Sequence, residues 1–315
     1  MIFSTDHLKG RIGIIMITFL MIHSSCRSPQ FQQDKTAGKL TIVTTTMMLE
    51  DAVINIAKDS VVVEAMMGPG VDPHLYKATQ GDLQKLSDAD LIIYNGLFLE
   101  GKMEDILERL GKIKPTLAAA EIIDKNKIRD NLFYPGTYDP HIWFDVHLWC
   151  EVVQNVNKAL QQHDPKNAAY YQSNATKFLK SLDSLHLKVR DEILKIPDDQ
   201  RVLVTAHDAF GYFGEAYKLE VKGLQGISTQ SEFGLRDITD LVKYIVNNKI
   251  KAVFIESSVS PRAINAVVAG CKERGFAVDI GGILFSDAMG EKGTPEGTYI
   301  GMVHANVKTI VEALK

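Results

Sequence analysis

The sequence of 315 residues predicts an α/β protein: two lobes of parallel sheet flanked by helices, joined by one long rigid helix. Short apolar runs alternate with helical patterns in both halves of the chain, and this alternation is typical of parallel sheets covered by helices. Between the halves, apolar residues recur every three or four positions over about thirty residues, as in an amphipathic helix. Such an arrangement leaves a cleft between the lobes.

The first 25 residues are predicted to be a secretory signal peptide. Lys9 and Arg11 precede an apolar run at 12–22, which is shorter than the roughly 20 residues of a membrane-spanning helix. Small residues then stand directly before Cys26, an arrangement that resembles the lipobox of bacterial lipoproteins. The resemblance implies cleavage before Cys26 and a lipid on its thiol, and the alternative is a plain secretory signal cut nearby. Residues 26–39 are expected to form the anchor and a flexible tether.

The first lobe is expected to span residues 40–163. Strands are predicted from short β-branched or apolar runs at 40–46, 61–66 and 89–94. Helices are predicted from the spacing of apolar residues at 47–58, 80–86 and 101–110. Thr79 is expected to be the N-cap of the second helix, because Asp82 three residues on can complete a capping box.

The connecting helix is assigned to residues 164–197. Asp164 and Pro165 provide an N-cap and a proline in the first turn, and the pattern stops before Pro197. About 31 residues of this segment at ~1.5 Å each make a helix ~45 Å long, so it is expected to contact both lobes. Its apolar positions are Tyr171, Ala175, Phe178, Leu182, Leu185, Val189 and Ile193.

The second lobe is expected to span residues 198–315 and to resume the alternation. Strands are predicted at 201–205, 252–255 and 276–280. Helices are predicted at 208–217, 235–247, 261–274 and 299–314.

The tripeptide Asp-Pro-His occurs twice, at 72–74 and at 139–141, each time after a turn that contains glycine. Proline fixes its own φ and pushes the preceding aspartate into an extended conformation, so the imidazole that follows has little freedom. Either copy alone is more simply explained as a turn. Two restrained imidazoles from distant parts of one chain indicate a shared ligand, and a metal ion is the chemical match.

Further candidate ligands lie just past predicted strand ends, where parallel sheets bind their ligands. They are His74 after the strand at 61–66, His207 after the strand at 201–205, and Asp287 after the strand at 276–280. With His141 they make three imidazoles and one carboxylate from both lobes. This set suits zinc and can also suit manganese or iron(II).

The remaining histidines of the mature chain are predicted to be solvated or to lie among packing residues. His163, His186 and His304 lie on or beside helical patterns. His147 is the main rival as a ligand because it is six residues from His141, but no turn restrains it.

Polar groups near the strand ends are expected to support the ligands by accepting the second N–H of an imidazole. The candidates are Glu256, Ser257, Asp145 and Asp208. Alternatively these carboxylates are solvated, and Asp145 and Asp208 are helix N-caps.

An exported zinc hydrolase would use Asp145, Asp208 or Glu256 as its general base. A catalytic zinc keeps three protein ligands and an open position, so the fourth candidate, Asp287, argues against that class.

Four segments together resemble the metal-binding solute-binding proteins of bacterial zinc/manganese ABC transporters. They are Gly-Val-Asp-Pro-His-Leu-Tyr at 70–76, Asp-Pro-His-Ile-Trp-Phe-Asp at 139–145, Thr-Ala-His-Asp-Ala-Phe-Gly-Tyr-Phe at 205–213, and Phe-Ser-Asp-Ala-Met-Gly at 285–290. The resemblance covers the mature chain in order and implies that the metal ligands are His74, His141, His207 and Asp287. It also implies the two lobes and the connecting helix.

The resemblance implies a receptor without catalytic residues that captures Zn²⁺ or Mn²⁺ and delivers the ion to an ABC transporter permease. A lipid-anchored monomer in the cell envelope is expected. Some members carry Glu at the third ligand position and are associated with manganese, whereas this chain has His207. Many zinc-specific members have a His-rich loop before the second ligand, but residues 125–138 contain no histidine. The metal stays open between zinc and manganese, and a metal-stabilised surface adhesin would share the same site.

The composition excludes one class of partner. A formal net charge of −4 and a pI near 6.1 leave no basic footprint for nucleic acid.

Two cysteines besides Cys26 remain, Cys150 and Cys271, which either pair in a disulfide or are buried as free thiols.

Overall fold

A four-stranded parallel sheet organises the first lobe in the computed structural model, which describes residues 38–131 and 136–315. Its order is β2-β1-β3-β4, with β1 at Leu40–Thr44, β2 at Val61–Ala65, β3 at Leu91–Tyr94 and β4 at Thr116–Ala118. The first three strands confirm the predicted ones. The sequence did not predict β4, because three residues are too few to show a periodicity.

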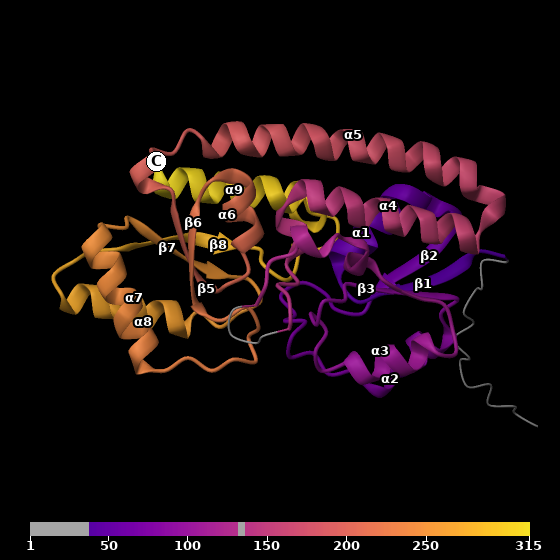
Figure 1. The fold of residues 1–315 in the computed structure, drawn as a ribbon, viewed down its shortest axis with the longest axis horizontal. Helices are drawn as coiled ribbons and strands as arrows, with labels where there is room; N and C mark the ends of the chain where they lie inside the picture. The colour runs from indigo at the N-terminus through magenta and orange to yellow at the C-terminus, as the bar shows by residue number, and fades with distance from the viewer. Residues whose placement is uncertain (1–37, 132–135) are drawn as a thin grey trace, which may run out of the picture. The chain divides into compact units, whose positions relative to one another are not determined.

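Helices cover both faces of this sheet (Figure 1). They are α1 at Met47–Ala57, α2 at Gln80–Asp88, α3 at Glu104–Gly111 and α4 at Val146–His163. Alternate strand residues serve opposite faces: Ile42 belongs to the core with α1 and α4, and its neighbour Val43 to the core with α2 and α3. The capping box of α2 is confirmed, because Thr79 and Asp82 each accept a hydrogen bond from the other's backbone N–H.

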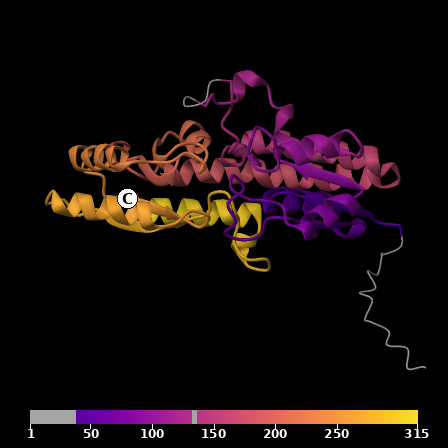
Figure 2. The same ribbon diagram turned by 90° about the horizontal axis from the view of Figure 1, so that it is seen from below.

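The long helix is α5 at Ala168–Ile193. It is shorter than the predicted 164–197, because a 3₁₀ turn at Pro165–Asn167 precedes it and the chain turns again before Pro197. All seven predicted apolar positions of this helix are buried. α5 packs against α1 and α4 of the first lobe and also against later helices of the chain, so it contacts both lobes as predicted (Figures 1 and 2).

The second lobe contains two pairs of parallel strands. They are β5 at Val202–His207 with β6 at Glu220–Gln225, and β7 at Ala252–Glu256 with β8 at Asp279–Leu284. β5 and β7 lie side by side, so the two pairs adjoin. The second-lobe helices are α6 at Gly211–Tyr217, α7 at Leu235–Asn248, α8 at Arg262–Glu273 and α9 at Tyr299–Leu314.

Two second-lobe strands differ from the prediction. β6 was missed because Lys222 and Gly223 interrupt its apolar pattern. β8 spans Asp279–Leu284 rather than 276–280. The predicted strand ended too early because it stopped before the pair Gly281-Gly282, and glycine is disfavoured inside strands. Gly281 is required there, since a Cβ would lie 2.7 Å from the ring of Phe254.

Short 3₁₀ helices connect several elements. They lie at Lys58–Ser60, Ala119–Ile122, Lys125–Lys127, Ile142–Phe144, Pro165–Asn167, Asp198–Gln200 and Pro295–Gly297. In residues 38–131 and 136–315, no helix combines the length and apolar character needed to cross a membrane. The predicted signal peptide and Cys26 lie outside the described residues. Cys150 and Cys271 are free and buried, so the disulfide alternative is wrong.

Candidate metal centre

The two Asp-Pro-His segments place His74 and His141 by the same local device. In each, the aspartate two residues earlier accepts a hydrogen bond from the histidine's backbone N–H, at 2.9 Å from Asp72 and at 3.0 Å from Asp139. This turn and the fixed φ of the intervening proline restrain both histidines locally, within three residues of chain. Both histidines are buried, at 1% and 0% exposure.

The other two side chains come from the carboxyl ends of second-lobe strands. His207 is the last residue of β5, which ends two residues later than the predicted strand at 201–205. Gly223 of β6 allows the close approach at this point, since a Cβ would lie 2.5 Å from the backbone N of Asp208. Asp287 follows the end of β8 by three residues, and its loop is tied to the His141 segment because Trp143 Nε1 donates to the carbonyl of Ser286 at 3.0 Å.

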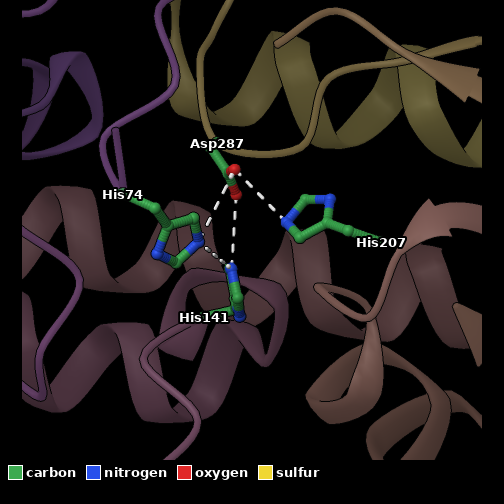
Figure 3. A group of neighbouring side chains, drawn as sticks. All are labelled: His74, His141, His207 and Asp287. Carbon is green, nitrogen blue, oxygen red and sulfur yellow. Dashed lines mark hydrogen bonds and ion pairs between the residues drawn. The ribbon is translucent and has the colours of Figure 1, made fainter. Parts of the chain in front are cut away.

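The structure brings all four predicted ligands to one point (Figure 3). His74 Nε2 and His141 Nε2 are 3.3 Å apart, and His141 Nε2 lies 3.4 Å from an oxygen of Asp287. Asp287 Oδ2 lies 3.3 Å from His207 Nε2 and 3.9 Å from His74 Nε2. A tetrahedral ion with bonds of ~2.0–2.1 Å has ligand atoms about 3.3 Å apart, so three of these separations match and one is slightly long.

Two of the three imidazoles bind protons strongly, so protons would compete with a metal cation for their nitrogens. Burial would lower the pKa of His141, but Asp139 and Asp287 raise it to about 9. Burial likewise opposes the charge on His207, and Glu256 and Asp287 raise its pKa well above the usual range. Although burial favours the neutral acid, the two imidazolium groups hold the pKa of Asp287 well below its usual value.

His74 differs from the other two imidazoles. Burial lowers its pKa to about 3, so its nitrogens are neutral at physiological pH. Its Nδ1 has no hydrogen-bond partner among the described residues. His74 therefore offers Nε2 to an ion without first releasing a proton.

A carboxylate lies behind each of the other two rings. Asp139 Oδ1 is 2.7 Å from His141 Nδ1, and Glu256 Oε2 is 2.6 Å from His207 Nδ1. Glu256 also accepts the backbone N–H of His207 at 2.8 Å. Carboxylates in this position fix the ring orientation and direct Nε2 toward the metal. Glu256 was among the predicted supporting residues, whereas Asp139 was not, although it stands two residues before His141.

The other predicted supporting residues lie elsewhere. Asp145 is the N-cap of α4, where it accepts the backbone N–H of His147. Asp208 is half-buried next to His207, and its carboxylate accepts no hydrogen bond from a candidate ligand among the described residues. Ser257 donates its backbone N–H to Leu284, and its hydroxyl has no partner in the described part of the chain.

Contacts across the cleft enclose the first ligand. Thr229 Oγ1 donates to Asp72 Oδ2 at 2.6 Å, and Gln230 Nε2 donates to the His74 carbonyl at 3.0 Å. A cavity of about 360 Å³ lies beside His74, lined by residues of both lobes that include Phe98, Tyr138 and Ile227. The four candidate ligands therefore lie in the cleft between the lobes, which the 228–231 segment of the second lobe closes.

We expect the carboxylates behind the rings to control affinity. Glu256→Gln and Asp139→Asn should each weaken metal binding about 10–100-fold. Each change removes the negative charge that both orients the adjacent imidazole ring and makes that ring more basic. Competition titration against a chromophoric chelator measures the change. Glu312→Gln, on the exposed side of α9, is the matched control and should leave affinity unchanged. Equal affinities for Glu256→Gln and the unmodified protein would show that the contact at His207 is incidental.

A buried group of three imidazoles and one carboxylate, shared between two α/β lobes, defines a metal-binding protein of the two-lobed receptor class. The profile of the family described as zinc-uptake complex component A, periplasmic (ZnuA), matches residues 42–313. The chain belongs to this family.

Relatives within the family carry names that refer to different metals. The chain is 51% identical over 280 residues to the manganese-binding lipoprotein MntA of Bacillus subtilis, covering 88% of this chain and 90% of that protein. It is 32% identical over 310 residues to the iron-binding protein YfeA of Yersinia pestis, covering 98% and 97%. Its fold matches the periplasmic zinc-binding protein TroA of Treponema pallidum with a TM-score of 0.85 and 46% identity, covering 88% and 99%.

Proposed function

We propose that this protein captures one divalent transition-metal ion outside the cytoplasm and delivers it to the membrane permease of an ABC transporter. The observation that carries the proposal is the convergence of four ligand atoms from both lobes at the spacing of a tetrahedral ion. The ligands are His74, His141, His207 and Asp287. The ion is cargo, because a site with four protein ligands keeps no open position for a reacting water.

The cargo is Zn²⁺ or Mn²⁺. Nitrogen-rich ligation binds zinc more tightly than manganese by the Irving–Williams order, while supply in the cell decides which ion is loaded. The relatives named for manganese, zinc and iron support a family site whose selectivity differs between members. We expect tighter binding of zinc in vitro.

The protein acts at the membrane surface, held by a lipid on Cys26 after removal of residues 1–25. Residues 26–39 form the tether, and the metal-binding part works as a monomer. The lipoprotein MntA, similar over 88% of this chain, supports the anchor. Such an anchor keeps the receptor near the permease, which raises the frequency of productive encounters.

Metal capture should release protons. His141 and His207 are protonated in the metal-free site near neutral pH, because their pKa values are raised, and each must lose a proton to bind the ion. Apparent affinity should therefore rise with pH, by up to about 100-fold per pH unit while both are protonated. For His141 this dependence should end near a pH of about 9. Calorimetry in buffers of different ionisation enthalpy measures the protons released. A pH-independent affinity between about pH 6 and about pH 8 would contradict this charge assignment.

A deletion strain tests the transport role. Loss of the gene should slow growth when zinc or manganese is limiting, and supplementation with the cargo ion should restore growth. Complementation with the His141→Ala variant should fail, while the His163→Ala variant, changed at an exposed histidine, should succeed. Normal growth of the deletion strain under limitation by either metal would contradict the role in uptake.

A further inference from the structure

Two histidines outside the buried site meet where α4 lies against α5. His147, the second residue of α4, is exposed, and His186 of α5 is half-buried. Their rings are stacked, with centroids 3.8 Å apart and planes inclined by 18°. One ligand atom from each of His147, His186 and Asp145 lies within 4.8 Å of the other two.

Neighbouring groups already orient two members of this cluster. Asp145 accepts the backbone N–H of His147 at 2.8 Å, which places its carboxylate at the start of α4. His186 Nδ1 lies 3.2 Å from the hydroxyl of Tyr217 on α6, so Nε2 is the ring nitrogen left for a ligand. A partner behind one ring nitrogen is the usual support of a metal-binding histidine. Burial, with His147 adding to it, lowers the pKa of His186, which keeps that ring neutral and able to bind.

We propose that Asp145, His147 and His186 form a second, solvent-accessible binding site for a borderline divalent transition metal such as Zn²⁺. Two imidazoles and one carboxylate are a ligand set that zinc accepts, with water completing the coordination. Helices α4 and α5 supply the ligands, and Tyr217 links the site to the second lobe. The site shares no ligand with the buried centre and does not depend on the transport function.

The cluster needs one movement to bind an ion. Stacked rings direct their in-plane nitrogen lone pairs side by side rather than toward one point. Ligand atoms bound tetrahedrally to one ion at ~2.1 Å lie about 3.4 Å apart. The three ligand atoms, which lie within 4.8 Å of one another, must therefore move closer together by up to about 1.4 Å to bind one ion. The exposed His147 is free to rotate its ring, while His186 stays against Tyr217. With three protein ligands and contact with water, the site binds more weakly than the buried centre.

Isothermal titration of the whole protein with ZnCl₂ tests the second site. After the first equivalent fills the buried centre, we expect a second event of one equivalent, weaker by at least about 100-fold because water supplies part of the coordination. His147→Asn and His186→Asn should each remove the second event and leave the first. His163→Asn is the control and should leave both.

The converse variant separates the two sites. His207→Ala should remove the tight event and retain the weak one, whatever the transport role of the buried centre. His147 is exposed, so His147→Asn keeps the test valid even if the His186 variant is unstable. A single binding event in the unmodified protein, or a second event that survives the His147→Asn/His186→Asn double change, would overturn the proposal.

Discussion

His74→Ala should lower the affinity for Zn²⁺ by more than about 100-fold. This loss exceeds that expected from removing a supporting carboxylate, because His74 supplies a ligand atom itself. His74 is the most informative ligand to remove. It is neutral in the metal-free site, and its Nδ1 has no hydrogen-bond partner in the described part of the chain. Its loss therefore leaves the charges of His141, His207 and Asp287 balanced as before.

The same variant should lose the stabilisation that metal confers. A protein that binds metal only in its folded state gains about 4 kcal/mol of stability when free metal is present at 1,000 times its Kd. Thermal unfolding with and without Zn²⁺ should show a large upward shift for the unmodified protein and a much smaller one for His74→Ala. Without metal, His74→Ala should unfold at a temperature only modestly below that of the unmodified protein, because the shorter side chain leaves a cavity. An undiminished metal-induced shift in His74→Ala would remove His74 from the ligand set.

His207→Glu should lower the ratio of zinc to manganese affinity by about tenfold or more, because it replaces a borderline nitrogen by a hard oxygen. The structure adds a condition to this experiment. Glu256 lies 2.6 Å from His207 Nδ1, so a new carboxylate would face it directly and the two charges would repel. The double variant His207→Glu/Glu256→Gln removes that repulsion, and Glu256→Gln alone is its control. A ratio that stays constant or rises in the double variant would show that this ligand does not set the preference.

The positions of the four candidate ligands were predictable because they depend on short-range features. The proline in each Asp-Pro-His segment restrains a histidine within three residues. His207 and Asp287 were found from strand ends, and this reasoning survived a shift of β8 by several residues, since the carboxyl ends of parallel strands still meet at one edge. The apolar positions of α5 were equally predictable, because a single period persists over the whole helix.

The partners of the two aspartates were not predictable from sequence. Asp72 and Asp139 occupy equivalent positions and form the same turn. Asp139 turns its carboxylate toward the imidazole of His141, whereas Asp72 uses an oxygen to accept from Thr229 across the cleft. The difference is tertiary, because Thr229 stands 157 residues away from Asp72 in the chain.

The pairing of His147 with His186 also depends on how α4 packs on α5, which no local pattern encodes. In sequence the two residues look like separate surface histidines, and His147 was considered only as a competitor for the buried site. The structure instead places it outside that site, beside Asp145 and His186. Pairs of ligands from different helices are found only when the register between the helices is known.

Anomalous diffraction at the zinc absorption edge, from crystals of the protein loaded with one equivalent of Zn²⁺, tests the central claim most directly. The arrangement of the site predicts one buried peak in the cleft, at ~2.0–2.1 Å from Nε2 of His74, His141 and His207 and from an oxygen of Asp287. A peak bound by fewer than three of these side chains, or the absence of a peak in the cleft, would contradict the assignment of this cluster as the site of metal capture.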